Sequence, residues 1–319
     1  MILAADIGGT NSRFAVFELR AGRLAKVWQE TFRSAEHAGV TELARAAREA
    51  CQRKITAATF GVAGPVRHGR SQTTNLPWVV DAQDLARALG LRTAGLINDL
   101  AANAYGLSEL SPADLVTLHA GEPGAEGNQA LISAGTGLGE AGLYWDGRHH
   151  QPFASEGGHT SFAPGDDREL TLWRWLKARF AHVSWERVVS GPGLVHIHAC
   201  LRETGQFPQS AAPAEDPAAI TAAAASGNDA LARSALDLFV TLYGAEAGNL
   251  ALKVMATGGV FLGGGIAPRI LPFLQDGRFL AAFFAKGRLR PVLEAMPVRV
   301  VTNDQAALLG AARHAAELS

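Results

Sequence analysis

One pattern occurs twice in this sequence: a short apolar run, a turn rich in glycine, and a second apolar run. The first copy occupies residues 2–17 with its turn at 8–11, and the second occupies residues 130–145 with its turn at 135–139. Two apolar runs on either side of a glycine turn are typical of a β-hairpin. Because each copy stands at the head of a segment in which strand and helix patterns alternate, the sequence predicts an internal duplication of two α/β halves.

The remaining elements are predicted from periodicity and capping residues. Asp81 is typical of a helix N-cap and Gly90 of the matching C-cap, and a polar stretch at residues 119–128 separates the two halves. The other expected elements are helices over 36–51, 229–255 and 304–317, strands over 57–62 and 96–97, and a proline-containing loop over 204–219.

Composition limits the partners and the location of the chain. Its 319 residues suggest two domains or one large α/β unit, and 29 Lys and Arg against 30 Asp and Glu leave no basic excess for nucleic acid. Residues 1–6 do not resemble a secretory signal, and charged residues interrupt the apolar stretch 231–262, so we expect no membrane span. With only Cys51 and Cys200, a reduced, cytoplasmic protein is expected.

Three glycine runs, at residues 8–11, 135–137 and 257–266, could hold phosphate groups through their backbone N–H groups. An ordinary hairpin turn is the alternative for the first run alone. Asp6, at the end of the first strand, could hold Mg²⁺ through water, because Mg²⁺ prefers oxygen ligands. The sequence has neither a P-loop lysine motif nor the glycine spacing that opens a Rossmann helix. Phosphate charge must therefore be met by Mg²⁺, backbone amides and hydroxyls.

Asp99 follows a short apolar strand, at the position where α/β proteins place their sites. An aspartate there could accept the proton of a hydroxyl that attacks a phosphoryl group. The alternative is a purely structural one, because Asn98 and Asp99 open a helical stretch and either is a good N-cap. From the local sequence alone the N-cap is the better supported of the two.

These motifs resemble those of known proteins. The three glycine runs are similar to the phosphate and adenosine motifs of the actin-like ATPase superfamily, which includes hexokinases and actin. Further stretches, spread in order over nearly the whole chain, resemble the bacterial glucokinase family. They are Thr74-Asn75-Leu76-Pro77-Trp78, Ile97-Asn98-Asp99, Glu156-Gly157-Gly158-His159, Glu186-Arg187-Val188 and Ser190-Gly191-Pro192-Gly193-Leu194.

The resemblance implies a duplicated ribonuclease-H-like α/β fold of two domains with a central cleft. A small domain over residues 1–105, completed by the C-terminal helix 303–319, would join a large domain over 106–302. It also implies a homodimer that transfers the γ-phosphoryl group of ATP, with Mg²⁺, to the 6-hydroxyl of D-glucose. Closure of the cleft around the sugar would exclude water.

The resemblance assigns roles to individual residues. It makes Asp99 the base, and it makes sugar ligands of Asn75, Asn98, Asp99, Glu156, His159 and Glu186. Without it, Glu186 would be expected to be a solvated helix charge. The ATP site would consist of Asp6, Gly8, Gly9, Thr10, Asn11, Gly135, Thr136, Gly137, Gly263, Gly264 and Gly265, with Asp6 also holding Mg²⁺ through water.

Two departures from related patterns bear on the site. Ser155 stands where a glycine commonly precedes the Glu-Gly-Gly-His motif, which could alter how that loop moves. The related ROK sugar kinases carry a cysteine-rich zinc motif that residues 160–164 lack, so no zinc site is expected. A ROK-type sugar-sensing repressor and a domain-moving ATPase are the alternative function classes. The first would need an N-terminal helix-turn-helix, and the second has no use for the sugar residues.

Overall fold

The computed structural model describes residues 1–73, 76–204, 207 and 214–318. The chain divides into two compact units. The first contains Met1–Asp114, Gln151–Ala154 and Asn303–Ser319, and the second contains Leu115–His150 and Ser155–Thr302. None of the helices in the described part of the chain is long and apolar enough to cross a membrane.

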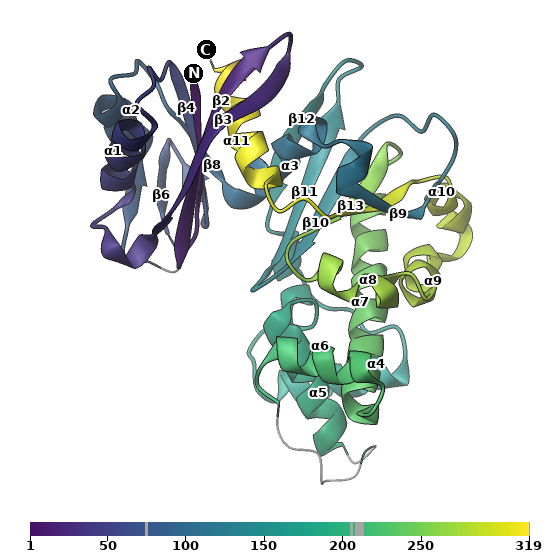
Figure 1. The fold of residues 1–319 in the computed structure, drawn as a ribbon. Helices are drawn as coiled ribbons and strands as arrows, with labels where there is room; N and C mark the ends of the chain where they lie inside the picture. The colour runs from purple at the N-terminus through teal and green to yellow at the C-terminus, as the bar shows by residue number, and fades with distance from the viewer. Residues whose placement is uncertain (74–75, 205–206, 208–213, 319) are drawn as a thin grey trace. The chain divides into compact units, whose positions relative to one another are not determined.

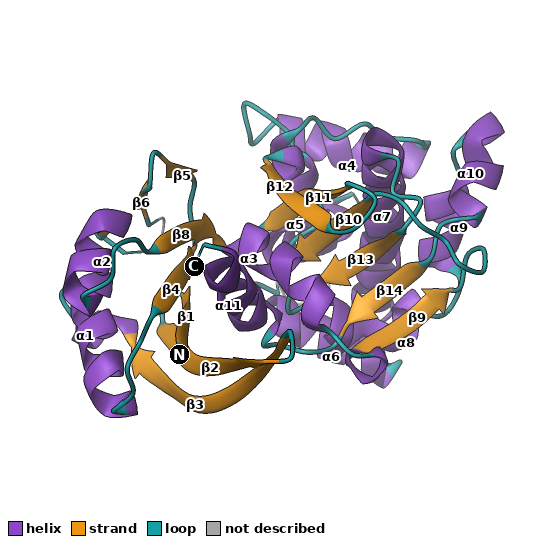
Figure 2. Cartoon of the chain, turned by 90° about the horizontal axis from the view of Figure 1, so that it is seen from above, coloured by secondary structure: helices purple, strands orange, loops and turns teal. Residues whose placement is uncertain are grey.

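The first unit is built on a five-stranded sheet in the order β3-β2-β1-β4-β8. Strands β1, β4 and β8 are parallel, whereas β1, β2 and β3 form antiparallel pairs. Helices α1 and α2 cover one face, and α3 and α11 cover the other (Figures 1 and 2). The bounds are β1 Ile2–Ile7, β2 Asn11–Arg20, β3 Arg23–Arg33, β4 Ala57–Val62, β8 Gly95–Asn98, α1 Val40–Cys51, α2 Ala82–Leu89, α3 Asp99–Gly106 and α11 Ala306–Glu317.

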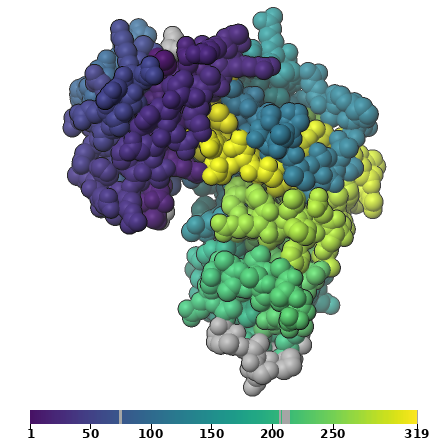
Figure 3. Space-filling view, in the orientation of Figure 1, coloured from purple at the N-terminus to yellow at the C-terminus, as the bar shows by residue number. Residues whose placement is uncertain are grey.

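Strand β1 is apolar on both faces because it packs against helices on both sides. Leu3 and Ile7 pack into the core with α1 and α2, while Ile2 and Ala4 pack against α11. Helices α3 and α11 pack closely because Gly310 has no side chain, and a Cβ there would overlap a carbonyl oxygen of α3. The C-terminal helix therefore completes the first unit, and its surface lies beside the N-terminal strands (Figure 3).

The second unit contains most of a six-stranded sheet in the order β12-β11-β10-β13-β14-β9. The long helix α7 is buried along most of its length and packs against β10, α5, α6 and α9. The bounds are β9 Leu115–His119, β10 Gln129–Ala134, β11 Leu138–Trp145, β12 His150–Ser155, β13 Gly259–Gly263, β14 Val298–Val301, α4 Asp167–Lys177, α5 Gly191–Glu203, α6 Pro217–Ser226, α7 Ala230–Val254, α8 Leu271–Leu274, α9 Arg278–Phe284 and α10 Arg290–Glu294.

Short elements complete the fold. A three-stranded sheet, in the order β5-β6-β7, precedes α2. The bounds are β5 Val66–Arg67, β6 Arg70–Gln72, β7 Val79–Asp81 and the 3₁₀ turns η1 Ser34–Glu36, η2 Leu107–Glu109, η3 Pro112–Asp114, η4 Gly157–His159, η5 Trp185–Arg187, η6 Ala267–Ile270 and η7 Gly287–Leu289.

The two large sheets repeat one topology, as the duplicated ribonuclease-H-like fold requires. The strand order β3-β2-β1-β4-β8 of the first sheet matches β12-β11-β10-β13-β14 of the second, with an antiparallel hairpin beside parallel strands in both. Both hairpins were predicted from the glycine turns. The predicted duplication of α/β halves is therefore confirmed at the level of topology.

Three expectations about local structure were wrong, and several strands were missed. The predicted helix 36–51 begins only at Val40, because the preceding residues form η1 and a short extended segment. Leu138 and Gly139 belong to β11, so the second turn is shorter than expected. Strand β9 was not predicted. Pro217 begins α6 instead of lying in a loop, because proline fits the first turn of a helix behind the N-cap Asp216.

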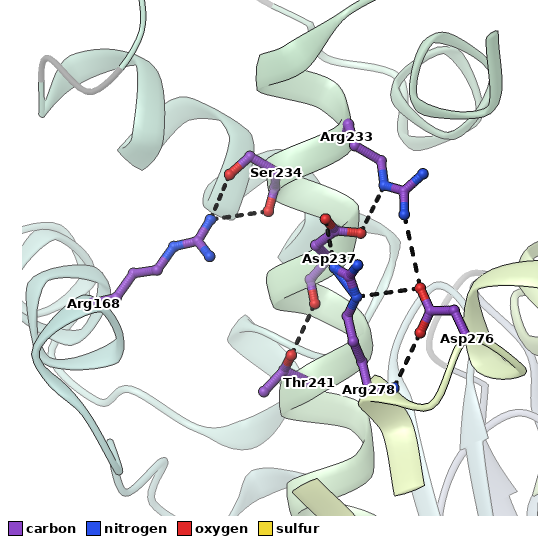
Figure 4. Close-up of polar contacts among 7 residues, drawn as sticks. All are labelled: Arg168, Arg233, Ser234, Asp237, Thr241, Asp276 and Arg278. Atoms are coloured by element: carbon purple, nitrogen blue, oxygen red, sulfur yellow. Dashed lines mark hydrogen bonds and ion pairs between the residues drawn. The ribbon is translucent and has the colours of Figure 1, made fainter. Parts of the chain in front are cut away.

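A charged network fastens α9 to the N-terminal half of α7 (Figure 4). Asp237 of α7 accepts a hydrogen bond from Arg233 Nε at 2.9 Å and pairs with Arg278 of α9. Arg278 also binds Asp276, at 3.2 Å. Arg233 and Asp237 belong to α7, and Arg278 belongs to α9. The network therefore joins two helices as well as neighbouring turns of one helix.

We expect Asp237→Asn to lower the free energy of unfolding by about 1 kcal/mol, because Arg233 and Arg278 lose one of the two carboxylates that they share and keep only Asp276. Urea unfolding measures this, and the difference should shrink in high salt. Asp84→Asn is the matched control, since the Asp84 side chain is 51% exposed and pairs with Arg87 within one helix. An equal loss in both variants would contradict a tertiary role for the network.

Candidate active site

The first unit places two carboxylates at one edge of its sheet. Asp6 is the residue before the last of β1, and Asp99 begins α3 directly after β8. Strand β4 lies between β1 and β8, with Gly61 opposite Asp6 on one side and opposite Ile97 on the other. The carboxyl ends of parallel strands share one edge, which is where α/β proteins build their sites.

The cap of α3 is Asn98, not Asp99. The Asn98 Oδ1 accepts the backbone N–H groups of Leu100 at 2.8 Å and Ala101 at 3.4 Å, and its Nδ2 donates to the carbonyl of Gly64 at 3.1 Å. The Asp99 Oδ1 accepts the same Leu100 N–H, at 2.9 Å. The structural role of helix N-cap, which the sequence left open between these two residues, therefore belongs to Asn98.

Burial raises the pKa of Asp99, and the negative charge of Asp6 raises it further, while the hydrogen bond from Leu100 N–H lowers it. Burial also raises the pKa of Asp6, against the lowering effect of Arg13. A raised pKa makes a carboxylate a better proton acceptor, as long as it stays ionised at neutral pH.

Arg13 was missed by the sequence analysis. Its guanidinium binds Asp6 at 3.1 Å and Asp304, just before α11, at 3.0 Å. The signal was present, because the hairpin register that follows from the turn at residues 8–11 sets Arg13 opposite Asp6. No local pattern in the sequence indicates that Asp304, from the other end of the chain, also binds Arg13.

The turn between β1 and β2 is fixed by Ser34. The Ser34 hydroxyl donates to the Gly8 carbonyl at 2.8 Å, and Ser34 N–H donates to the Thr10 carbonyl at 3.0 Å. Within the turn, Gly8 N–H donates to the Asn11 carbonyl at 3.1 Å. A Cβ on Gly8 would lie 2.6 Å from that carbonyl oxygen, so this position requires glycine. Gly9 is half-buried, whereas Thr10 and Asn11 are exposed.

The second unit brings the other two glycine runs together. The strands β10 and β13 are parallel neighbours, and the turns that follow them are residues 135–137 and 264–265. Ile266 N–H donates to the Ala134 carbonyl at 3.3 Å across the two turns. At both Gly135 and Gly265, no atom lies within 4 Å of the position that a Cβ would occupy. A ligand could therefore approach the backbone closely here, whereas Gly263 is buried within β13.

Glu186 lies against the turn at residues 135–137. Its Oε2 accepts the Leu138 N–H at 3.0 Å, and a Cβ on Gly137 would lie 2.5 Å from the same oxygen. Glu186 is half-buried within η5, so the alternative of a solvated helix charge is wrong.

The loop that carries Glu156 and His159 lies beside η5. Trp185 N–H donates to the Thr160 carbonyl at 3.0 Å, and His182 Nε2 bonds to the His159 carbonyl at 2.9 Å. The side chains of Glu156 and His159 are both exposed, at the two ends of η4. The second unit thus groups the Glu156–His159 loop, Glu186 and two glycine turns.

Gly158 has no room for a side chain, because a Cβ there would overlap the Leu138 carbonyl oxygen of the neighbouring backbone. The resemblance to glucokinases makes Glu156 and His159 of this loop sugar ligands. On that basis we expect Gly158→Ala to displace the loop from β11 and raise the KM for sugar by at least about tenfold, a loss of about 1.4 kcal/mol in binding. Steady-state kinetics measures this. Gly39→Ala is the matched control for folding, because a Cβ there would meet no atom within 4 Å and the backbone is extended. Unchanged sugar KM in Gly158→Ala would contradict the loop's role.

Two sequence expectations stand apart from these groups. Asn75 lies outside the described residues. The sequence also has two histidine pairs, His149-His150 and His196-Ile197-His198, that could suggest metal ligands. Within the described ranges, no three His, Cys, Asp or Glu side chains are arranged to hold a metal ion. His150 instead bonds the Gly127 carbonyl at 3.0 Å, and His198 is buried in α5.

Comparison with known proteins agrees with the fold and the motifs. A family model described as "Glucokinase" matches residues 3–318. The glucokinase of Nostoc sp. is 40% identical over 340 residues, covering 100% of this chain and 99% of that protein. A crystal structure of glucokinase from an Antarctic psychrotroph superposes with a TM-score of 0.90 at 34% identity, covering 99% and 98% of the two chains.

A more distant structure shows how far the fold extends. A ROK family glucokinase from Streptomyces griseus, in complex with glucose and AMPPNP, has a TM-score of 0.65 at 20% identity and covers 99% of both chains. At that identity the likeness concerns the fold alone. The family match and the closer relatives span nearly the whole chain, so this chain belongs to the glucokinase family.

Proposed function

We propose that this protein transfers the γ-phosphoryl group of ATP to the 6-hydroxyl of D-glucose, giving glucose 6-phosphate and ADP. The observation that carries the proposal is the position of Asp99 and its raised pKa, in a chain that belongs to the glucokinase family. It stands at the carboxyl end of β8 with a raised pKa, and the neighbouring Asn98 caps the helix. Asp99 is therefore available for proton transfer.

Asp99 accepts the proton of the 6-hydroxyl as the new O–P bond forms. An alcohol is a weak nucleophile while it keeps its proton, and an aspartate that takes this proton is the recurring arrangement in kinases. Asn98 holds α3 at the end of β8 and so fixes where the Asp99 carboxylate points.

Glu156, His159 and Glu186 bind the sugar hydroxyls in this proposal. Carboxylates and an imidazole offer acceptors and donors in fixed directions, and a sugar that leaves one of them unpaired binds less well. Glu186 also accepts the Leu138 N–H, so one residue connects the sugar ligands with the turn at residues 135–137.

The nucleotide is held by backbone in this proposal. The glycine turns at residues 135–137 and 264–265 supply backbone N–H groups, with room for close approach at Gly135 and Gly265, while Thr10 and Thr136 add exposed hydroxyls. Residues 8–11 supply a third turn, in the first unit.

Mg²⁺ fits the donor set at the sheet edge of the first unit. Asp6 offers carboxylate oxygens there, and its negative charge interacts with that of Asp99. Mg²⁺ usually keeps several waters and takes one or two carboxylates together with substrate phosphates. When bound, the ion would neutralise phosphate charge. Asp6 would hold it through water, since Arg13 already occupies one carboxylate oxygen.

A coupled assay of ADP release with and without glucose tests the proposed function. We expect turnover only when both ATP and glucose are present. A sugar sensor would bind glucose and release no ADP, and a domain-moving ATPase would release ADP without glucose. Either result would contradict the proposal.

A further inference from the structure

A buried glutamate lies directly under the loop that carries Glu156 and His159. Glu140 is on β11 and only 1% exposed. Among the described residues, no N–H or hydroxyl donates to its Oε1. An ionised carboxylate in that position would be costly, because burial without hydrogen bonds penalises the charged form.

The neighbour of Glu140 is a second buried carboxyl group. Glu246 of α7 is 0% exposed and accepts hydrogen bonds from Asn249 Nδ2 at 2.7 Å and Lys253 Nζ at 3.1 Å. Lys286 Nζ supports this arrangement by donating to Asn249 Oδ1 at 2.6 Å. Both oxygens of Glu246 thus have donors, one of them a cation, whereas Glu140 has none.

These partners decide which carboxyl group keeps a proton. Two adjacent buried carboxylates cannot both stay ionised at neutral pH. The negative charge is stabilised on Glu246 by Lys253, so the proton resides on Glu140, whose carboxyl O–H donates a hydrogen bond to Glu246. Burial first, and then the charge of Glu246, raises the pKa of Glu140 to about 8, against the lowering effect of Lys253.

Glu140 also contacts the loop above it. A Cβ on Gly157 would overlap the Glu140 Oε2, so the carboxyl group packs directly on the Gly157 backbone. The Ser155 hydroxyl donates to the Glu140 carbonyl at 3.0 Å and accepts from Gly157 N–H at 3.2 Å. Ser155, which stands where a glycine is common, thereby ties the loop to β11 at the same residue.

We propose that Glu140 is a positioning residue for sugar binding: as the neutral partner of Glu246, packed on Gly157 and joined to it through Ser155, it holds the loop that carries Glu156 and His159. The proposal rests on the proposed function of that loop. It adds Glu140, a residue that itself touches no substrate. It also makes the position of the loop depend on pH.

The direction of that dependence follows from the surrounding charges. Glu140 faces Glu246 and Lys253 from α7, and Lys286 is joined to Glu246 through Asn249. When Glu140 ionises, its negative charge is repelled by that of Glu246. The carboxylate can then reach solvent by displacing the loop that covers it. The bound state of the loop is then populated only in the protonated fraction. With a pKa of about 8, that fraction falls to about one tenth at pH 9, so the KM for glucose should rise about tenfold.

Steady-state kinetics of the full chain at pH 7 and pH 9 tests this. Glu140→Gln keeps the shape and the hydrogen bond to Glu246 without titrating, so its glucose KM should stay low at both pH values. Glu140→Ala should have a raised KM at both. Glu169→Gln, which changes another buried glutamate with a raised pKa, is the matched control and should retain the alkaline rise. The same alkaline rise in Glu140→Gln, or a flat profile in the unmodified protein, would overturn the proposal.

Hydrogen exchange of the sugar-free protein gives a readout that does not depend on activity. After correction for intrinsic rates, amides of residues 157–160 should exchange faster at pH 9 than at pH 7 in the unmodified protein, but not in Glu140→Gln. Equal protection in both proteins overturns the positioning role even if phosphotransfer is normal. Absence of phosphotransfer with the expected exchange instead contradicts the proposed function and leaves the contact of Glu140 with the loop intact.

Discussion

Asp99→Asn is expected to lower kcat about 10²- to 10⁴-fold, which corresponds to about 3 to 5 kcal/mol in the activation barrier. Asparagine keeps the size of the side chain and removes the carboxylate that accepts the hydroxyl proton. The melting temperature should hardly change, because Asn98 is the residue that caps α3. Phosphotransfer kinetics at saturating substrates, together with thermal unfolding, measures both quantities.

Asp81→Asn is the matched control for this experiment. Asp81 is a helix N-cap in the same unit, where its Oδ1 accepts from Gln83 N–H at 2.8 Å. Asp and Asn are similar N-caps, so kcat and stability should both stay near their original values. If Asp99→Asn kept more than about a tenth of the original kcat, the loss would be too small for a missing base. The assignment of Asp99 would then be wrong.

Removal of divalent cations is expected to abolish turnover completely and reversibly. The motifs offer backbone N–H groups and hydroxyls to the phosphates, and the sequence has no P-loop lysine. Neutralisation of the phosphate charge is therefore left to Mg²⁺. Activity should disappear in excess EDTA and return when Mg²⁺ is added in excess over the chelator.

Two controls separate this effect from damage to the protein. Thermal unfolding without nucleotide should be the same with and without EDTA, since the fold is held by its apolar cores. Asp6→Asn should raise the Mg²⁺ concentration needed for half-maximal activity. Full turnover in excess EDTA would contradict the charge argument, and an unchanged Mg²⁺ requirement in Asp6→Asn would remove Asp6 from the metal site.

The local parts of this fold could be predicted from the sequence. Both hairpins, strand β4 at Ala57–Val62 and the capped helix α2 follow from residue periods, glycine turns and a single aspartate. Each of these signals lies within about ten residues of the element it specifies. The start of α1 was missed because the residue before it, Gly39, has no side chain that could cap the helix. The sequence therefore has no clear start signal at this position.

The candidate site was less predictable because its contacts join distant segments. Glu186 and the Leu138 N–H are 48 positions apart, and Arg13 and Asp304 are 291 positions apart. No local pattern pairs such residues, so the sequence placed Glu186 at the site only through its resemblance to a family. The buried pair of Glu140 and Glu246 had no signal at all, since each is an ordinary glutamate in its own segment.

Product analysis with γ-labelled ATP tests the central claim most directly. With D-glucose as acceptor, we expect one label transferred to the sugar for each ADP released, at the 6-position. With 6-deoxyglucose, which lacks the accepting hydroxyl, no label should reach the sugar. Label released only as inorganic phosphate, or transferred equally well to 6-deoxyglucose, would contradict phosphoryl transfer to the 6-hydroxyl.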